Sequence, residues 1–424
     1  MLTLPFLRDN RAAAVAGLRK KHVPEPEQAV DRILELDARR RTAQQESDAL
    51  AAQANQQAKR IGELMKQGQK AEAEALRAQV AEEKARMKDL ADAVAQAEAD
   101  MQAALVLLPN IPSAAVPEGR VAEDNVVAKE GGRKPELHPG AQPHWELIKT
   151  LGIIDFELGV KITGAGFPVY RGGGALLQRR LIQLFLDRAV EAGYEEVQPP
   201  ILVNADSGFG TGQLPDKEGQ MYHAVADDLY LIPTAEVPVT NIFRDVILER
   251  HQLPQKLAGY TPCFRREAGS WGAHVRGLNR LHQFDKVEIV QVRTPEESYQ
   301  ALEEMCAHVE SLLDTLELPW RKLLLCGGDM SFSSAQTFDY EVWSAAQGRW
   351  LEVSSVSNFE TFQANRLKLR YRPEEKKTAL AHTLNGSAMA LPRIVAALLE
   401  NNQQPDGSVV LPAVLNMPVL RPVA

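Results

Sequence analysis

The first third of the chain has the hydrophobic spacing of a long helical hairpin. From residue 73 to residue 108, a series at alternating intervals of three and four contains ten apolar residues among its eleven positions. The positions are Ala73, Leu76, Val80, Glu83, Met87, Leu90, Val94, Ala97, Met101, Ala104 and Leu108. This spacing places the side chains along one side of a helix, where a second helix can cover them.

A weaker series with the same spacing runs from Ile33 to Leu64, and Gly68 lies between the two series in a polar stretch that suits a turn. Each predicted helix has about 40 residues and a length of about 60 Å. We therefore predict an N-terminal domain over residues 1–108, in which residues 26–108 form an antiparallel coiled-coil hairpin, here called the arm. The spacing alone leaves open whether the arm mediates dimerisation or binds a partner.

The pattern changes after residue 108. Residues 109–145 are rich in proline and glycine, which predicts a connector. From residue 146 to residue 424, aromatic and β-branched residues return. Helix-like stretches over 175–192 and 296–316 alternate with strand-like stretches over 196–203, 229–232, 281–292 and 350–355. Strands in hairpin-like order with helices between them predict an α+β domain built on an antiparallel sheet flanked by helices.

Composition narrows the class of protein. The chain has 424 residues, of which 45% are hydrophobic and 25% are charged, and it has no run of 18 apolar residues and no secretory signal pattern at its start. We therefore expect no membrane partner. The three cysteines, Cys263, Cys306 and Cys326, are far apart and form no CxxC pair, which argues against a disulfide framework and a zinc site. These features predict a reducing, cytoplasmic location.

The charge distribution refines the expectation about partners. With 48 basic and 56 acidic residues the net charge is −8, which at first argues against nucleic acid. Residues 1–108 contain 17 basic and 17 acidic residues, however, so the whole acidic excess lies downstream. Residues 1–108 are thus neutral overall, and any binding of nucleic acid by the arm would depend on selected basic side chains.

The chain lacks a GxxxxGK[ST] phosphate loop, and the glycines at 172–174 are interpreted as a turn before a helix. Two strand-like runs around 260–267 and 281–288 predict a hairpin instead. Alternation places Phe284, Lys286 and Glu288 on one face of its second strand. With the arginines opposite, the Phe284 ring and the Glu288 carboxylate could stack a base, neutralise phosphate and bind an amine. On these residues alone, a surface hairpin with ion pairs is the simpler interpretation.

Five ordered segments then carry a resemblance to a known family. Residues 264–288, with Phe264-Arg265-x-Glu267 and His282-Gln283-Phe284-x-Lys286-Val287-Glu288, resemble motif 2 of class II aminoacyl-tRNA synthetases in their seryl-tRNA synthetase form. Residues 174–200 resemble motif 1, and residues 234–238 resemble the serine-recognising segment. Residues 352–359 resemble the strand that binds metal and ATP, and residues 382–401 resemble motif 3. The resemblance covers nearly the whole chain.

The resemblance implies a serine–tRNA ligase with a class II catalytic domain over residues 146–424. Such an enzyme joins L-serine and ATP into seryl-adenylate, then transfers the seryl group to the 3′ end of tRNA(Ser), and tRNA(Sec) is a second candidate acceptor. The resemblance also implies Mg²⁺, a homodimer with motif 1 at the subunit contact, and no DNA partner. The arm would reach toward tRNA, and the basic residues proposed near its tip are Lys59, Arg60, Lys66 and Lys70.

The same resemblance assigns residue roles. Arg265 and Arg393 would be catalytic, at the α-phosphate and the γ-phosphate, where a planar guanidinium offers paired donors. The implied serine-binding residues are Thr234, Ala235, Glu236, Glu288, Asn385 and Ser387. The implied ATP-binding residues are Arg265, Arg266, Glu267, Leu281, Phe284, Glu352, Val353, Ser354, Ser355 and Arg393. Glu352 and Ser355 would supply hard oxygen ligands for Mg²⁺, and His282 is expected to pack rather than act as a base.

Some residues depart from the family pattern, and two other functions are compatible with parts of the sequence. Arg266 stands where the family commonly has serine, and Trp271 and Val275 lie in a loop that is usually small and polar. One alternative function is a ligase that passes the adenylate to a carrier protein or small molecule, but such relatives generally lack the arm. The other is an inactive coiled-coil scaffold, against which the joint presence of the motif residues counts.

Overall fold

The computed structural model describes residues 1–216, 219–267, 276–374 and 377–423. They divide into two compact units, Met1–Pro109 and Asn110–Ala424. No helix among the described residues is long and apolar enough to cross a membrane.

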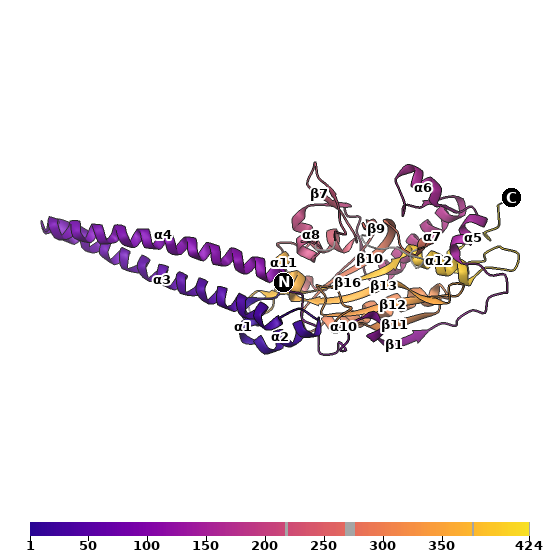
Figure 1. The fold of residues 1–424 in the computed structure, drawn as a ribbon, viewed down its shortest axis with the longest axis horizontal. Helices are drawn as coiled ribbons and strands as arrows, with labels where there is room; N and C mark the ends of the chain where they lie inside the picture. The colour runs from indigo at the N-terminus through magenta and orange to yellow at the C-terminus, as the bar shows by residue number, and fades with distance from the viewer. Residues whose placement is uncertain (217–218, 268–275, 375–376, 424) are drawn as a thin grey trace. The chain divides into compact units, whose positions relative to one another are not determined.

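The first unit is helical. Its elements are α1 (Leu4–Asp9), α2 (Arg11–Lys20), α3 (Pro26–Lys66) and α4 (Lys70–Val106). Helices α3 and α4 lie side by side and antiparallel (Figure 1), and the chain reverses at Gly68, whose φ is 78°. Such a positive φ is accessible to glycine at little cost. The predicted coiled-coil hairpin is therefore confirmed.

Burial along the arm follows the predicted series of positions. Between residues 71 and 100, every position of the series is buried or half-buried, and all others are exposed. Across the two helices, the Arg86 side chain donates to Glu46 at 2.9 Å, and the amides of Gln53 and Gln57 both donate to Glu83 Oε1, at 2.7 and 2.8 Å. Glu83 is the one polar residue of the stronger series, so these bonds favour a single alignment of the helices.

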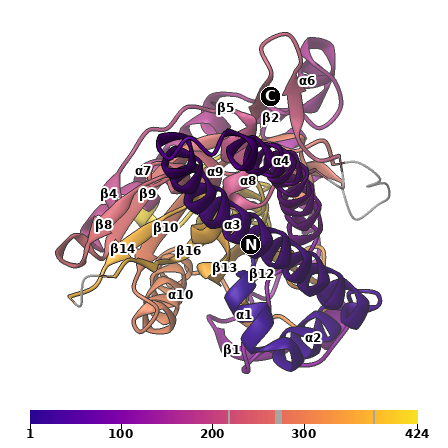
Figure 2. The same cartoon turned by 90° about the vertical axis from the view of Figure 1, so that its left-hand side faces the viewer.

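The second unit is built on an eight-stranded sheet with the order β1-β11-β12-β13-β16-β10-β9-β4. Its strands are β1 (Val126–Gly131), β4 (Glu195–Glu196), β9 (Gln255–Phe264), β10 (Gln283–Arg293), β11 (Trp320–Leu324), β12 (Gln336–Ser344), β13 (Arg349–Glu360) and β16 (His382–Ala390). Neighbours in this sheet are antiparallel, apart from the short parallel pairing of β4 with β9. Figure 2 shows β9, β10, β16, β13 and β12 in succession. The α+β prediction is confirmed.

Helices and small sheets surround the central sheet. The helices are α5 (His144–Thr150), α6 (Phe156–Ile162), α7 (Gly172–Glu191), α8 (Ala205–Thr211), α9 (Glu236–Asn241), α10 (Ser298–Thr315), α11 (Thr361–Leu367) and α12 (Leu391–Asn401). Short 3-10 turns are η1 (Ala122–Asp124), η2 (Arg250–Gln252), η4 (Gly277–Asn279) and η5 (Ala413–Leu415). The small sheets pair β2 (Ile154–Asp155) with β3 (Val169–Tyr170), join β5 (Leu202–Val203), β7 (Leu229–Leu231) and β6 (Tyr222–Ala224), and join β15 (Ala379–Leu380), β14 (Arg370–Arg372) and β8 (Ile247–Glu249).

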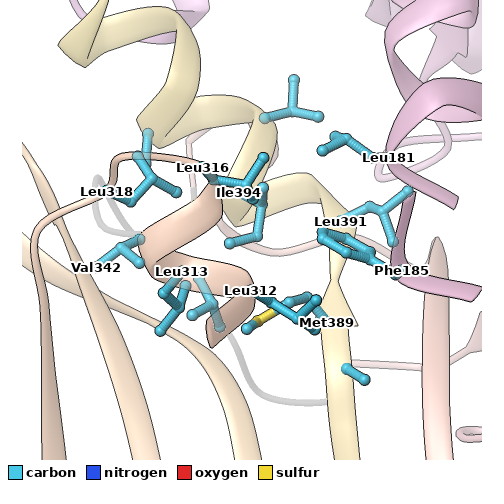
Figure 3. Packing of buried hydrophobic residues seen from close by; sticks show 14 of the residues in the cluster. Leu181, Phe185, Leu312, Leu313, Leu316, Leu318, Val342, Met389, Leu391 and Ile394 are labelled. Atoms are coloured by element: carbon cyan, nitrogen blue, oxygen red, sulfur yellow. The ribbon is translucent and has the colours of Figure 1, made fainter. Parts of the chain in front are cut away.

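The main hydrophobic core lies between the sheet and helices α7, α10 and α12 (Figure 3). Strand β10 has two different faces because its side chains alternate. Val287 and Ile289 belong to this main core, whereas Val290 and Val292 belong to a second core with α9 and α11. Alternation places Lys286 and Glu288 on the same face as Val290 and Val292. Lys286 and Glu288 therefore point toward α9, whereas Phe284 packs against the edge of the main core.

Three expectations about local structure were wrong. Residues 196–203 are not one strand, because Pro199 and Pro200 separate β4 from β5, and proline lacks the N–H that a sheet ladder needs. The glycines at 172–174 form the first turn of α7 rather than a turn before it. Residues 109–145 do not act only as a connector, because they include β1, which pairs with β11 at the sheet edge.

We predict that Phe185→Ala destabilises the second unit by about 3–5 kcal/mol, because the Phe185 ring is fully buried and its removal leaves a cavity. Val190→Ala on the same helix is the matched control and should change the free energy of unfolding by less than about 0.5 kcal/mol, since Val190 is 49% exposed. Urea unfolding followed by tryptophan fluorescence reports on this unit alone, because all five tryptophans follow residue 110. Equal effects of the two variants would contradict this account of the core.

Candidate active site

The β9–β10 hairpin places the motif 2 residues. In its register, Phe284 lies opposite Cys263, Lys286 opposite Thr261, and Glu288 opposite Gly259. The hairpin loop at 268–275, with the departures Trp271 and Val275, lies outside the described residues. At the loop's two ends, Glu267 and Arg280 form an ion pair. The hairpin predicted from the sequence is therefore present.

The residues implied in serine binding converge on β10. The Lys286 ammonium donates to Thr234 Oγ1 at 2.7 Å and pairs with Glu288, and the Thr234 hydroxyl donates to Glu288 Oε2 at 3.3 Å. On the neighbouring strand β16, Ser387 lies directly beside Glu288 in the register, and Asn385 lies beside Val290. All five of these polar side chains are buried. A buried cluster with this many charges needs internal partners or a ligand.

Glu236, the first residue of α9, is the second carboxylate of this cluster. Burial, and after it the nearby Glu288 carboxylate, raises the pKa of Glu236 to about 7. The Gln363 amide donates to Glu236 Oε1 at 2.6 Å, and the Thr383 hydroxyl donates to the Gln363 carbonyl oxygen at 2.7 Å. Gln363 thus fixes the orientation of Glu236. At neutral pH, a nearby cation would shift Glu236 toward its ionised form.

Within the described part of the chain, the buried Asn385 amide nitrogen makes no hydrogen bond of acceptable geometry, although it lies close enough to Glu236 to lower the pKa of that carboxyl. Its side chain is only 7% exposed. An unsatisfied buried donor is costly, so a ligand hydroxyl or carboxylate at this position would be stabilised.

The residues implied in binding the nucleotide border the same cluster. The Arg265 guanidinium lies over the Phe284 ring, 5.1 Å from its centroid, and Arg265 Nε donates to the Pro233 carbonyl oxygen at 3.4 Å. Both Arg265 and Phe284 are half-buried. The exposed Arg266 guanidinium lies 5.7 Å from the Tyr222 ring centroid. A flat aromatic face beside guanidinium groups can bind a base and its phosphates.

Other implied residues meet on β13 and α12. Arg393 on α12 donates from Nη1 to the Glu352 carbonyl oxygen at 2.8 Å and from Nε to the Asn279 carbonyl oxygen at 2.9 Å. Its guanidinium is also 3.8 Å from the Glu352 carboxylate. Arg393 therefore connects β13 to η4, which follows the hairpin loop.

The oxygen atoms near Glu352 suit a hard cation such as Mg²⁺. Ser355 and Asp339 are neighbours in the β12–β13 register, and Asp339 Oδ1 is buried without a hydrogen-bond partner among the described residues. Burial, followed by the Glu352 carboxylate, raises the pKa of Asp339. The described residues contain no group of three or more His, Cys, Asp or Glu side chains able to hold a metal unaided.

Some implied residues contribute no side chain to the cluster. Val353 and Leu281 are packed in the main core, and Ala235 is fully buried in the second core. The Ser354 hydroxyl donates to the Ser387 carbonyl oxygen at 2.5 Å, which ties β13 to β16. These four residues can face a ligand only through the main chain. His282 packs against Phe167 as expected, with ring centroids 5.5 Å apart.

Sequence reasoning assigned no role to Lys286, Gln363 or Asp339. The alternation of β10 did place Lys286 on the same face as Glu288, so the sequence pattern already indicated that the two side chains are close. Gln363 lies on a helix, 75 residues along the chain from Glu288, and a single glutamine carries no spacing signal. Asp339 could be found only through the pairing of β12 with β13.

Comparison with known proteins agrees with this geometry. Residues 1–112 match the family model of the seryl-tRNA synthetase N-terminal domain, and residues 222–402 match the tRNA synthetase class II core domain (G, H, P, S and T). The serine–tRNA ligase of Salinibacter ruber is 51% identical over 417 residues, which cover 98% of this chain and 97% of the relative.

Solved structures give the same result. The seryl-tRNA synthetase of Pyrococcus horikoshii, complexed with ATP, aligns over 100% of both chains with a TM-score of 0.96 and 33% identity. The cytoplasmic serine–tRNA ligase of Naegleria fowleri, in complex with AMP, shares the fold with a TM-score of 0.88 and 22% identity, over 98% of this chain and 97% of that chain. Because relatives and solved structures match over the full length and the motif residues meet in one cluster, the chain belongs to the seryl-tRNA synthetase family of class II aminoacyl-tRNA synthetases.

Proposed function

We propose that the chain is a serine–tRNA ligase that activates L-serine with ATP in the cluster formed by Thr234, Glu236, Glu288, Asn385 and Ser387. The observation that carries this proposal is a buried cluster with two carboxylates on elements that adjoin two half-buried arginines, Arg265 directly after β9 and Arg393 on α12. The carboxylates suit the ammonium group of an amino acid, and the arginines suit phosphate.

The first reaction needs no protein nucleophile. A carboxylate oxygen of serine attacks the α-phosphorus of ATP, the bond to the β-phosphate oxygen breaks, and pyrophosphate leaves with its electron pair. Arg265 offsets the charge on the α-phosphate, Arg393 holds the γ-phosphate, and Phe284 stacks on the adenine, whose amino group donates to Glu267. Catalysis is thus mainly alignment and charge stabilisation.

Glu352 and Ser355 are the proposed Mg²⁺ ligands. When bound, the ion would offset the charge of the triphosphate. Arg393 contacts the Glu352 main chain, so the same residue orients the strand that holds the ion and reaches the γ-phosphate.

Specificity for serine is assigned to Asn385 and Ser387, which lie on β16 beside β10. A pocket that hydrogen-bonds a substrate hydroxyl leaves its own polar atoms unpaired when alanine enters, and such sites discriminate by a factor of about 10⁴ or more. Threonine would be excluded by the lack of room for its methyl group.

The arm is the proposed tRNA-binding element, and tRNA(Ser) is its proposed ligand, with tRNA(Sec) as a second acceptor to be tested. Lys59, Arg60, Lys66 and Lys70 near its tip are exposed and could contact phosphates along an RNA helix. Helices α3 and α4 already cover each other's apolar positions. The arm therefore has little apolar surface left for dimerisation, which favours its role in binding RNA.

We also propose a homodimer and a cytoplasmic location. Val160 and Ile162 of α6 are 57% and 71% exposed, so this helix offers apolar side chains that a second copy could cover. All three cysteines are buried and free, which suits a reducing compartment.

We predict serine-dependent ATP–pyrophosphate exchange. Serine should support exchange, alanine and glycine should be poorer by about 10⁴-fold in kcat/KM, and threonine should also be poor. The measurement is the incorporation of labelled pyrophosphate into ATP with each amino acid in turn. An absence of exchange with serine would refute the proposed enzyme outright.

A second prediction concerns the arm. Removal of residues 26–108 should leave serine-dependent exchange intact, because the described serine and nucleotide residues all lie after residue 230. Charging of bulk tRNA should fall strongly, because the proposed phosphate contacts are lost. If charging stayed at the wild-type rate, the proposed role of the arm would be wrong.

A further inference from the structure

A buried lysine lies inside the proposed serine pocket. Lys286 is 5% exposed, and its ammonium contacts Thr234 and Glu288, the residues that face the proposed amino-acid site. A buried ammonium is costly unless it is paired, and an ion pair inside a protein seldom adds stability over an apolar pair. The position therefore calls for a functional explanation.

The Thr234 hydroxyl has no remaining hydrogen-bonding capacity. Its oxygen accepts from the Lys286 ammonium at 2.7 Å and from the Glu236 main-chain N–H at 3.2 Å, and its proton goes to Glu288 Oε2. A hydroxyl offers one donor and two acceptor positions. With Lys286 in place, a substrate ammonium must bind through the carboxylate oxygens of Glu236 and Glu288.

The charges of the proposed serine site sum to zero with one bound ammonium group only if Lys286 is present. Glu236 and Glu288 contribute two negative charges and Lys286 contributes one positive charge, so one substrate ammonium neutralises the rest. From β9, the Cys263 thiol faces Lys286 and Glu288, and Arg265, directly after β9, also lies near Cys263. From α11 and β16, the neutral side chains of Gln363 and Asn385 face Glu236. Without Lys286, two buried carboxylates would repel each other.

We propose that Lys286 is a positioning residue for serine: its ammonium fixes Thr234 and Glu288 and offsets one of the two carboxylates, so that the pocket binds a single ammonium group. This inference rests on the proposed function, because it assumes that Glu236 and Glu288 bind the amino group of serine.

The pH dependence of serine binding reports this charge balance. Burial and Glu288 raise the pKa of Glu236 to about 7, whereas Lys286 lowers it. Because the ionised carboxylate binds the ammonium, affinity for serine is lost as the pH falls through this pKa. Removing the charge of Lys286 raises the pKa further, so the loss of affinity begins at a higher pH.

The test compares Lys286→Met and Lys286→Arg with a matched control, Lys322→Met. Lys322 is also buried on a strand and paired with a glutamate, at 2.9 Å from Glu303, but it lies on β11. KM values for serine and for ATP are measured by pyrophosphate exchange from about pH 6 to about pH 9. Circular dichroism verifies that each variant is folded.

For Lys286→Met we expect the KM for serine to rise about tenfold or more at pH 7, while the KM for ATP changes less than about threefold. The acid-side midpoint of kcat/KM for serine should move up by about one pH unit. In Lys286→Arg, which keeps the positive charge, the acid-side midpoint should stay near its wild-type value. The Lys322→Met control should not move this midpoint. Glu236→Gln, which removes the titrating group and keeps Lys286, should abolish the acid-side loss even if Lys286→Met fails to fold.

The proposal is overturned if Lys286→Met leaves both the serine KM and the midpoint unchanged, or if both KM values rise together as general damage would cause. An acid-side loss that persists in Glu236→Gln overturns it as well. The Glu288→Gln variant distinguishes a wrong role for Lys286 from a wrong assignment of the serine site. If Glu288→Gln raises the KM for serine and Lys286→Met does not, only the role of Lys286 is wrong. If neither variant affects serine, the proposed serine site is wrong.

Discussion

The structure depends on the contrast between the two faces of β10. One face carries Val287 and Ile289 into the main core, and the other carries Lys286 and Glu288 toward α9 before it returns to Val290 and Val292. Buried charges in the middle of a sheet lower its stability unless their partners are held in place. The neighbouring β16, the start of α9, and Gln363 of α11 supply those partners. The elements around β10 thus stabilise a buried cluster in which two carboxylates are paired with a single lysine.

The arm could be predicted from the sequence because its signal is local and repeated. The three–four spacing extends over many turns, and the burial of residues from Ala73 to Ala97 follows it position by position. The hairpin at 260–288 was predicted from strand alternation, and its chemistry was recognised only through the resemblance of several segments. The segment at 196–203 was predicted wrongly because its hydrophobicity outweighed Pro199 and Pro200, which end the pairing.

The parts of the site that could not be predicted depend on pairing between distant strands and helices. Gln363 orients Glu236 across 127 residues of chain, and Asp339 meets Ser355 only through the β12–β13 register. Neither contact leaves a pattern in the sequence. The net charge of −8 shows a related limit, since it is the sum of a neutral N-terminal domain over residues 1–108 and an acidic remainder of the chain. Only the division of the chain shows that this charge does not exclude an RNA partner.

The central claim is that serine binds as an ammonium between Glu236 and Glu288, and proton release on binding tests it most directly. With a pKa of about 7, Glu236 is about half protonated at pH 7 in the free enzyme. Calorimetric titration with serine, in two buffers of different ionisation enthalpy and with a non-hydrolysable ATP analogue present, measures the protons released. The account predicts a release of up to about half a proton per site, which Glu236→Gln abolishes. Binding of serine with no proton release in the wild-type protein would contradict it.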